Sequence, residues 1–340
     1  MMKVSIAVPA YNEGRNIGHL IDSLRSQRTH RAQIVEIVVV ASGCTDDTAA
    51  IVADRAARPG VPVRLIEEAH RRGKVAAINT YLRHSHPDID AICLCSADLL
   101  VSPEVVERLV QCLLINHDVG MCGARPMPTN GHGTLHGEAT RFIWQMHHRV
   151  ALEAPKLGEL VMFRAGLVNG LPPESAVDEA TLEQQVSSSG YRLAYVPEAV
   201  VHNHGPETLR DFVRQRRRIA AGHYWLRAVS GYSVSTMDLS RTARLTLDEL
   251  SALGRTARLY ALGTIGVEIL SRALGWLDFR FDRRDHAVWK VSESTKTVMT
   301  EELRAVYDLD RQAEPAKPAQ TPVQSAREFG PHDAALTPAA

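Results

Sequence analysis

The feature that most constrains this chain is a repeated change of apolar periodicity along its first half. Short β-branched runs alternate with stretches whose apolar side chains recur at helical spacing: the runs at 4–8, 34–41, 61–66 and 89–97, and the stretches at 16–24 and 74–82. Runs that are apolar at nearly every position predict strands buried on both faces. The alternation therefore predicts an α/β fold, with a mostly parallel sheet flanked by helices.

Polar clusters follow the ends of these predicted strands. Open α/β sheets bind ligands at the carboxyl ends of their strands. We therefore expect the clusters to meet along one edge of the sheet: Tyr11–Glu13, Ser42–Asp46, Arg71–Lys74 and Ser96–Asp98.

The second half of the chain predicts mainly helices. Residues 210–228 form a strongly basic helical pattern, and 239–276 indicate further helices. Residues 313–340 are rich in Pro and Ala and poor in large apolar side chains, which is typical of a disordered tail. We expect a catalytic domain over residues 1–230, a helical extension over 231–312 and a disordered tail over 313–340.

Composition excludes some classes of protein. The chain has 39 Lys and Arg against 39 Asp and Glu, and this balance argues against a nucleic-acid partner, which favours a basic excess. The most apolar helical stretch, 260–276, contains Glu268 and Arg272, so we expect no membrane span. The first apolar run ends at Pro9 and does not resemble a signal peptide. Five cysteines without a CxxC pair favour reduced thiols, and we expect a cytoplasmic protein.

Known nucleotide-binding motifs are missing after the first predicted strand. Neither GxGxxG nor GxxxxGK[ST] is present, which weakens a hydride-transfer enzyme and a P-loop NTPase as interpretations. A different ordered set of motifs occurs instead: Pro9–Glu13 (PAYNE), Ala41–Thr48 (ASGCTDDT), Gly73–Asn79 (GKVAAIN), Ser96–Asp98 (SAD), Val177–Glu179 (VDE) and Gln215–Ile219 (QRRRI).

In type, order and spacing these motifs resemble those of the family 2 nucleotide-sugar glycosyltransferases, over about residues 3–230. The resemblance implies a GT-A fold and a nucleoside diphosphate sugar as donor. Uridine is the commonest donor base in the family, so a UDP-sugar is expected. Ile219 stands where processive members have tryptophan, which favours the addition of one or a few sugars.

A divalent cation, Mg²⁺ or Mn²⁺, is implied as the cofactor because the leaving diphosphate must be neutralised. Asp98 stands at the second acid of the family's D-x-D motif and is the expected ligand. Ser96 replaces the first acid and adds no charge. His202 is expected as the histidine ligand, with His204 as second choice. The alternatives are a helix cap at Asp98 and a surface histidine pair.

The resemblance also implies an inverting transfer, in which one base removes the proton of the acceptor hydroxyl. Glu179 stands where the family usually has an aspartate base, and Asp178 is a neighbour that could raise its pKa. The alternative is a pair of acids favoured by the dipole at a helix start.

The donor contacts implied by the motifs are Pro9, Tyr11, Glu13, Ser42, Lys74, Ser96, Ala97 and Arg218. Tyr11 and Glu13 are expected to hold the base and ribose, whereas Lys74 and Arg218 are expected at the phosphates. The alternatives are a turn at Tyr11, a surface lysine and a solvated arginine face. Asp46 is expected to cap a helix.

The acceptor is left open as a small molecule, a lipid-linked molecule or a glycan. The C-terminal helices could cover the acceptor, pair two subunits as a homodimer or contact a membrane surface. Two other functions remain as alternatives. A sugar nucleotidyltransferase would need a glycine-rich basic loop after the first strand, whereas a non-catalytic nucleotide-sugar-binding protein is favoured by Ala41, Ser96 and Glu179.

Overall fold

The computed structural model describes residues 1–281, and the end of the expected extension, 282–312, and the expected tail, 313–340, lie outside them. The strands are β1 Met2–Ala10, β2 Ala32–Ser42, β3 Val63–Glu68, β4 Ala91–Cys95, β5 Leu99–Val101, β6 Val119–Pro128, β7 Leu160–Arg164 and β8 Arg192–Asn203. The helices are α1 Ile17–Arg25, α2 Thr48–Ala56, α3 Lys74–His84, α4 Val105–Ile115, α5 Leu135–Glu153, α6 Asp178–Ser188, α7 Leu209–Ser230, η1 Ser235–Met237, α8 Leu239–Ala252 and α9 Arg255–Phe281.

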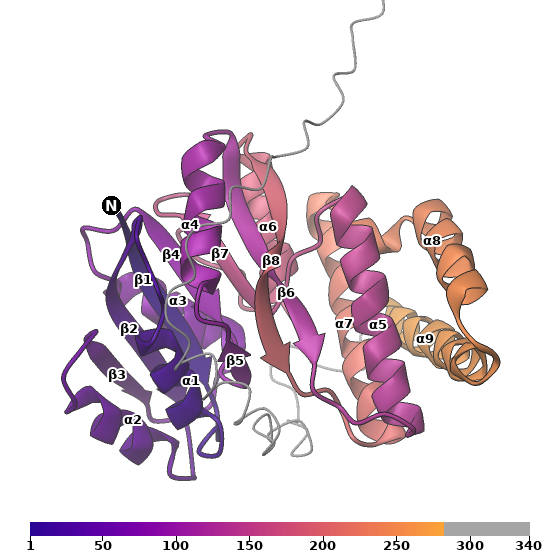
Figure 1. Ribbon diagram of the computed structural model, residues 1–340, viewed down its shortest axis with the longest axis horizontal. Coiled ribbons are helices and arrows are strands. Elements are labelled where there is room, and N and C mark those ends of the chain that lie inside the picture. The colour runs from indigo at the N-terminus through magenta and orange to yellow at the C-terminus, as the bar shows by residue number, and fades with distance from the viewer. Residues whose placement is uncertain (282–340) are drawn as a thin grey trace, which may run out of the picture.

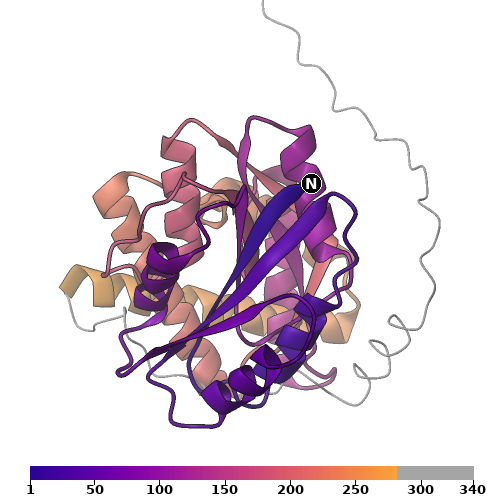
Figure 2. The same cartoon turned by 90° about the vertical axis from the view of Figure 1, so that its left-hand side faces the viewer.

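The strands form one sheet in the order β3-β2-β1-β4-β7-β6-β8-β5. The sheet is twisted (Figure 2). Strands β3, β2, β1 and β4 are parallel to one another, as are β6 and β8. Strand β7 is antiparallel to both of its neighbours, and β5 is antiparallel to β8. The predicted α/β fold with a mostly parallel sheet is therefore confirmed, with a reversal of direction at β7.

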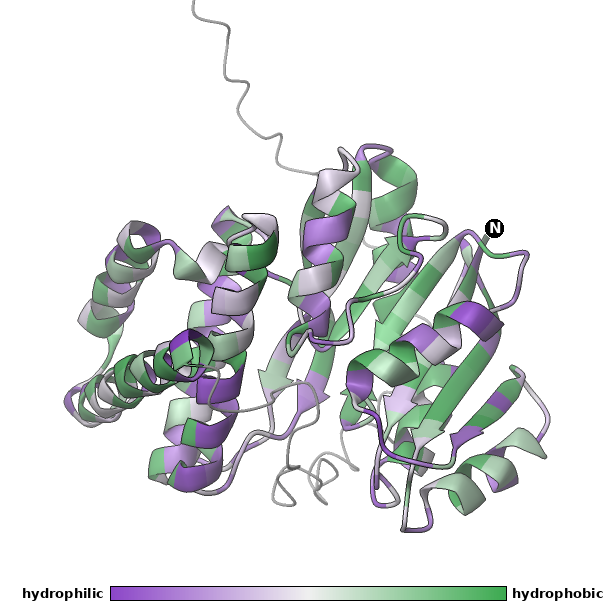
Figure 3. Ribbon diagram, turned by 180° about the vertical axis from the view of Figure 1, so that it is seen from behind, coloured by the Kyte–Doolittle hydropathy of each residue, from purple (hydrophilic) through white to green (hydrophobic). Residues whose placement is uncertain are grey.

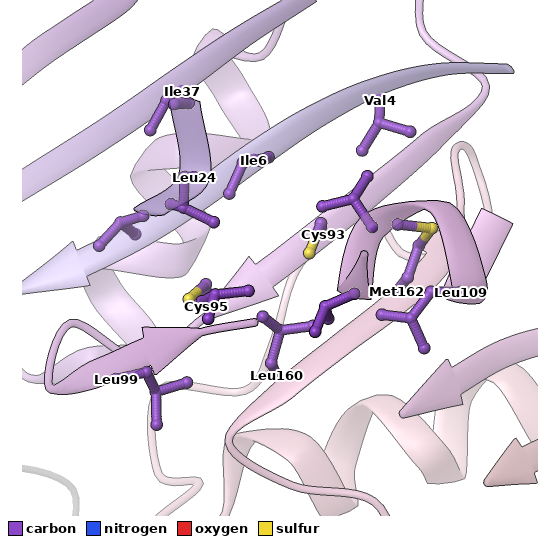
Figure 4. Packing of buried hydrophobic residues seen from close by; sticks show 14 of the residues in the cluster. Val4, Ile6, Leu24, Ile37, Cys93, Cys95, Leu99, Leu109, Leu160 and Met162 are labelled. Atoms are coloured by element: carbon purple, nitrogen blue, oxygen red, sulfur yellow. The ribbon is translucent and has the colours of Figure 1, made fainter. Parts of the chain in front are cut away.

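The sheet buries both of its faces, which explains why its strands are apolar at successive positions (Figure 3). Ile6 and Ile37 pack on one face with α1 and α4, together with Cys93 and Cys95 (Figure 4). Ala7 and the alternate residues of β2 pack on the other face, against α3 and α6. All five cysteines are free thiols, as expected.

Helices α5, α7, α8 and α9 form a separate group beyond β6 and β8 (Figure 1). Arg216 of α7 forms a bidentate pair with Glu268 of α9 at 2.7 and 2.8 Å, and Arg217 pairs with Asp278. These arginines therefore fix α9 against α7 instead of facing solvent. Among the described helices, none is long and apolar enough to span a bilayer.

Two loops at the carboxyl end of the sheet are tied together. The Asn12 side chain accepts a hydrogen bond from the Thr45 backbone at 2.8 Å, and the Asp46 carboxylate accepts one from the Gly14 backbone at 3.0 Å. Gly43 has a φ of +63°, and a Cβ there would lie 2.3 Å from the Arg71 nitrogen. Only glycine fits this crossing without moving the backbone.

We expect Gly43→Ala to lower the free energy of unfolding by roughly 2 kcal/mol, since it adds a strained φ and a clash with backbone. Urea denaturation measures the change. Gly254→Ala is the matched control. The φ of Gly254 does not lie in the left-handed region, and no atom lies within 4 Å of the added Cβ. Equal stability of the two variants would contradict the tight crossing at Gly43.

Candidate active site

A cavity of about 1490 Å³ extends from the carboxyl ends of β1, β2 and β4 to the helical group. Every residue expected to contact the donor lines it, and so do Asp98, Asp178 and Glu179. His204 also lines the cavity, but His202 is not among the lining residues. The sheet topology thus brings motifs far apart in the sequence to one place, as the strand-end rule predicts.

Lys74 is the centre of the charged part of this cavity. Its Nζ lies 2.8 Å from Asp178 Oδ2, 2.8 Å from Glu179 Oε1 and 3.3 Å from Ser96 Oγ. The Asp178 side chain is 5% exposed, whereas those of Lys74 and Glu179 are each 19% exposed. Lys74 therefore forms an ion pair with each carboxylate of the VDE motif, and Glu179 is the more accessible of the two.

Burial and this ion pair move the pKa values in opposite directions. Burial raises the pKa of Asp178 to about 6, helped by the charge of Glu179 and opposed by Lys74. Burial also acts to raise the pKa of Glu179, but the ammonium of Lys74 outweighs it and lowers that pKa to about 2. Burial would lower the pKa of Lys74 itself, yet the two carboxylates raise it above its usual value.

Two other cations lie at this end of the cavity. Arg218 donates to the Ala176 carbonyl at 2.8 Å, and burial lowers its pKa despite the carboxylates of Asp178 and Glu179 nearby. The guanidinium of Arg71 lies 4.1 Å from the centre of the Tyr11 ring. Tyr11 thus has a cation on one face, and Arg71, the first residue of the predicted Arg71–Lys74 cluster, lines the cavity.

Ser42 has a structural partner. Its hydroxyl donates to Glu68 Oε2 at 2.6 Å, and the same carboxylate accepts from Arg72 and Thr80. Glu68 therefore supplies an acid from β3 beside Ser42 of the Ala41–Thr48 motif. This acid could not be predicted, because nothing in the β3 pattern shows which strand lies beside β2.

Glu159 is a second acid beside the predicted motifs. It lies just before β7, has a φ of +62° and lines the cavity. Burial raises its pKa to about 8, with further contributions from the charges of Asp98 and Glu179. Asn203 Nδ2 donates to Glu159 Oε1 at 3.3 Å.

The residues considered for a metal are the carboxylate of Asp98 and the imidazoles of His202 and His204. Asp98 lies in the turn between β4 and β5, beside the end of β8. His204 contacts Thr129 through Nδ1 at 2.8 Å and Glu207 through Nε2 at 3.0 Å. Within residues 1–281, no three His, Cys, Asp or Glu side chains gather in a way that would hold a metal ion. A cation here would need further ligands, as from a diphosphate and water.

The far end of the cavity is mostly apolar, although Glu268 and Arg272 of α9 also line it. Its lining comes from α5, α8 and α9, and it includes Phe142, Met146, Val150, Leu250, Leu262, Ile265 and Ile269. Leu262 and Ile269 are also exposed at the protein surface, at 50% and 64%. The cavity therefore joins a charged end at the sheet with an apolar end that reaches the surface at α9.

Comparison with known families matches most of the described chain. The model of Glycosyl transferase family 2 matches residues 5–166, and that of Glycosyl transferase family group 2 matches residues 87–277. Among solved structures, the mannosyltransferase PcManGT from Pyrobaculum calidifontis, in complex with GDP-Man and Mn²⁺, superposes with a TM-score of 0.59. The two chains are 22% identical, and the match covers 83% of this chain and 88% of that one.

Curated relatives match over shorter stretches. The undecaprenyl-phosphate 4-deoxy-4-formamido-L-arabinose transferase of Sodalis glossinidius is 31% identical over 34% of this chain and 35% of its own length. The probable glycosyltransferase YdaM of Bacillus subtilis is 24% identical over 66% of this chain and 56% of its own. The match thus spans about a third of the first relative and just over half of the second.

We expect Lys74→Met to lower the free energy of unfolding at pH 8 by roughly 3 to 5 kcal/mol, because two buried carboxylates lose their counter-charge. The deficit should shrink toward pH 5, since the carboxyls then take up protons and become neutral. Thermal denaturation between pH 5 and pH 8 measures this, with the surface variant Lys3→Met as control. A deficit independent of pH would contradict the charge explanation.

Proposed function

Since this chain belongs to the family 2 glycosyltransferases, we propose that it is an inverting, metal-dependent enzyme that moves a sugar from a nucleoside diphosphate sugar to a lipid-linked acceptor. A UDP-sugar is the proposed donor. The observation that carries the proposal is the meeting of Asp98, Lys74 and the Asp178–Glu179 pair in one cavity whose other end is apolar. The five free cysteines support a reducing cytoplasmic location.

The charged end of the cavity suits the donor. Tyr11 and Glu13 stand at the end of β1, where a base and a ribose would be held. Lys74 and Arg218 supply positive charge for the diphosphate. In the donor-free protein Lys74 pairs with Glu179, so a diphosphate would compete for this ammonium and raise the pKa of Glu179 toward a value suited to a base.

The transfer needs one proton acceptor. The acceptor hydroxyl oxygen forms a bond to the anomeric carbon, its proton passes to Glu179, and the bond from that carbon to the diphosphate oxygen breaks. The nucleoside diphosphate leaves with the bonding electrons. Asp178 is nearly buried and serves to hold Lys74.

The carboxylate of Asp98 is a hard oxygen ligand, which fits Mg²⁺ or Mn²⁺ better than a soft metal. A bound cation would neutralise the leaving diphosphate. Asp98 would be its first protein ligand. Of the two histidines considered, His204 is the better candidate because it lines the cavity, and it would have to release Glu207.

We expect Glu179→Gln to lower kcat by about 100-fold or more, because the base is lost. Donor affinity should not fall, since the Lys74 ammonium is then no longer paired with Glu179. The measurement is transfer from a panel of nucleotide sugars with Mg²⁺ or Mn²⁺, beside thermal shift for donor binding. Glu174→Gln, in the exposed loop before α6, is the control. If the wild type binds a donor but neither transfers nor hydrolyses the sugar, the proposal is contradicted and a non-catalytic binding protein is favoured. If it releases pyrophosphate from a nucleoside triphosphate and a sugar phosphate, a nucleotidyltransferase is favoured.

Helix α9 supports a lipid-linked acceptor. In a typical surface helix the apolar side chains are buried and the polar ones are exposed, whereas α9 has the opposite distribution. Its buried positions are small or polar: Ala261, Thr264, Ser271, Gly275 and Asp278. Its exposed positions include Leu259, Leu262, Ile269, Leu270, Trp276 and Phe281, and we call these six residues the α9 apolar face. Such a face favours burial in another apolar phase.

A lipid surface is the proposed partner of the α9 apolar face. The exposed Arg255, Arg258 and Arg280 lie near its two ends, and they complement anionic headgroups. The apolar end of the cavity opens at Leu262 and Ile269, within the same face. A lipid chain could therefore pass from the surface toward the charged end without crossing water.

We expect the double variant Leu259→Glu/Leu270→Glu to bind anionic liposomes more than about tenfold more weakly than the wild type, since two apolar side chains no longer enter the lipid. Neither residue lines the cavity, so thermal shift with nucleotide should be unchanged. Ile115→Glu, exposed on α4, is the control. If the wild type does not bind liposomes and forms a dimer, and the double variant is a monomer, the α9 apolar face is a subunit interface instead.

A further inference from the structure

The Ser96–Asp98 turn has lost one acid, and the structure places another acid beside it. Leu160, the first residue of β7, pairs with Cys95, the last residue of β4. The next backbone contact along this ladder joins the Ser96 N–H to the Glu159 carbonyl at 2.9 Å. Glu159 therefore lies directly beside the position from which the acid is missing.

The backbone of Glu159 is in an unfavourable conformation. Its φ of +62° lies in the left-handed region, which costs free energy for a residue with a Cβ. Glycine would adopt this φ without strain. The residue at this strained position is nevertheless a glutamate, and it lines the charged end of the cavity.

Asn203 is the second observation that points to a ligand. It is 5% exposed, lines the cavity and donates from Nδ2 to Glu159 Oε1 at 3.3 Å. Its Oδ1 is buried and accepts no hydrogen bond from any group in residues 1–281. A buried amide oxygen without a partner is costly unless a ligand satisfies it. Carboxylate and amide oxygens are ligands that hard divalent cations prefer.

We propose that Glu159 supplies the second carboxylate of the metal site, in place of the acid missing at Ser96, and that Asn203 positions it and offers its own Oδ1. The site then consists of oxygens from three strand ends: Asp98 after β4, Glu159 before β7 and Asn203 at the end of β8. This inference rests on the proposed metal-dependent function, and it concerns binding of the cation rather than the transfer step.

The test is the binding of Mn²⁺ to the full chain, measured from the loss of the free-ion EPR signal with and without UDP. Glu159→Gln keeps the shape and removes the charge, so Mn²⁺ affinity should fall by about tenfold or more. Glu198→Gln, an exposed acid of β8 outside the cavity lining, should leave the affinity unchanged. The double variant Ser96→Asp/Glu159→Gln should recover most of the lost affinity, because it returns an acid to the adjacent position.

A further variant separates a ligand from a structural role. Glu159→Gly relieves the backbone strain, so we expect a higher Tm together with weaker Mn²⁺ binding. A lower Tm with unchanged Mn²⁺ affinity would overturn the inference, and so would Glu159→Gln that binds Mn²⁺ as well as wild type. If wild-type protein binds neither UDP nor Mn²⁺, the proposed function itself fails, which is a different outcome from failure of Glu159 alone.

Discussion

The ion pair of Lys74 with Asp178 and Glu179 joins the two parts of the sheet. Lys74 begins α3 on the side of the parallel strands, whereas the two acids begin α6 after the antiparallel strand β7. Without the ammonium, two adjacent carboxylates would face each other in a nearly buried position, which is strongly unfavourable. The charged end of the cavity therefore depends on both parts of the chain, because one supplies the ammonium and the other supplies the two carboxylates.

Much of the site could be predicted because strand ends of an α/β sheet meet along one edge. The clusters at Tyr11, Lys74 and Asp98 each follow a recognisable strand or open a helix, so local pattern was enough to bring them together. The position of Glu159 beside Ser96 could not be predicted, because it depends on the pairing of β7 with β4, which are far apart in the sequence. The preference for His202 over His204 rested on local pattern alone, which does not show where β8 ends relative to the cavity.

The basic segment of α7 shows a second limit of local pattern. A run of arginines in a sequence suggests a single basic surface, but successive side chains of a helix point in different directions. Arg216 and Arg217 pair with acids of α9, whereas Arg218 contacts Ala176 near Asp178 and Glu179. Their acidic partners lie about 50 to 60 residues further along the chain, so only the packing of α9 reveals how the charges are divided.

The hydrogen bonds that the Thr45 backbone donates to Asn12 and the Gly14 backbone donates to Asp46 have a consequence for molecular recognition. They hold the wall of the cavity beside Tyr11 in one conformation before any ligand arrives, so little conformational entropy is lost when a nucleotide enters. The opposite end is lined by aliphatic and thioether side chains, which adapt their rotamers to different shapes. We therefore expect selectivity for the nucleotide to be strict and tolerance toward the length of an apolar chain to be wide.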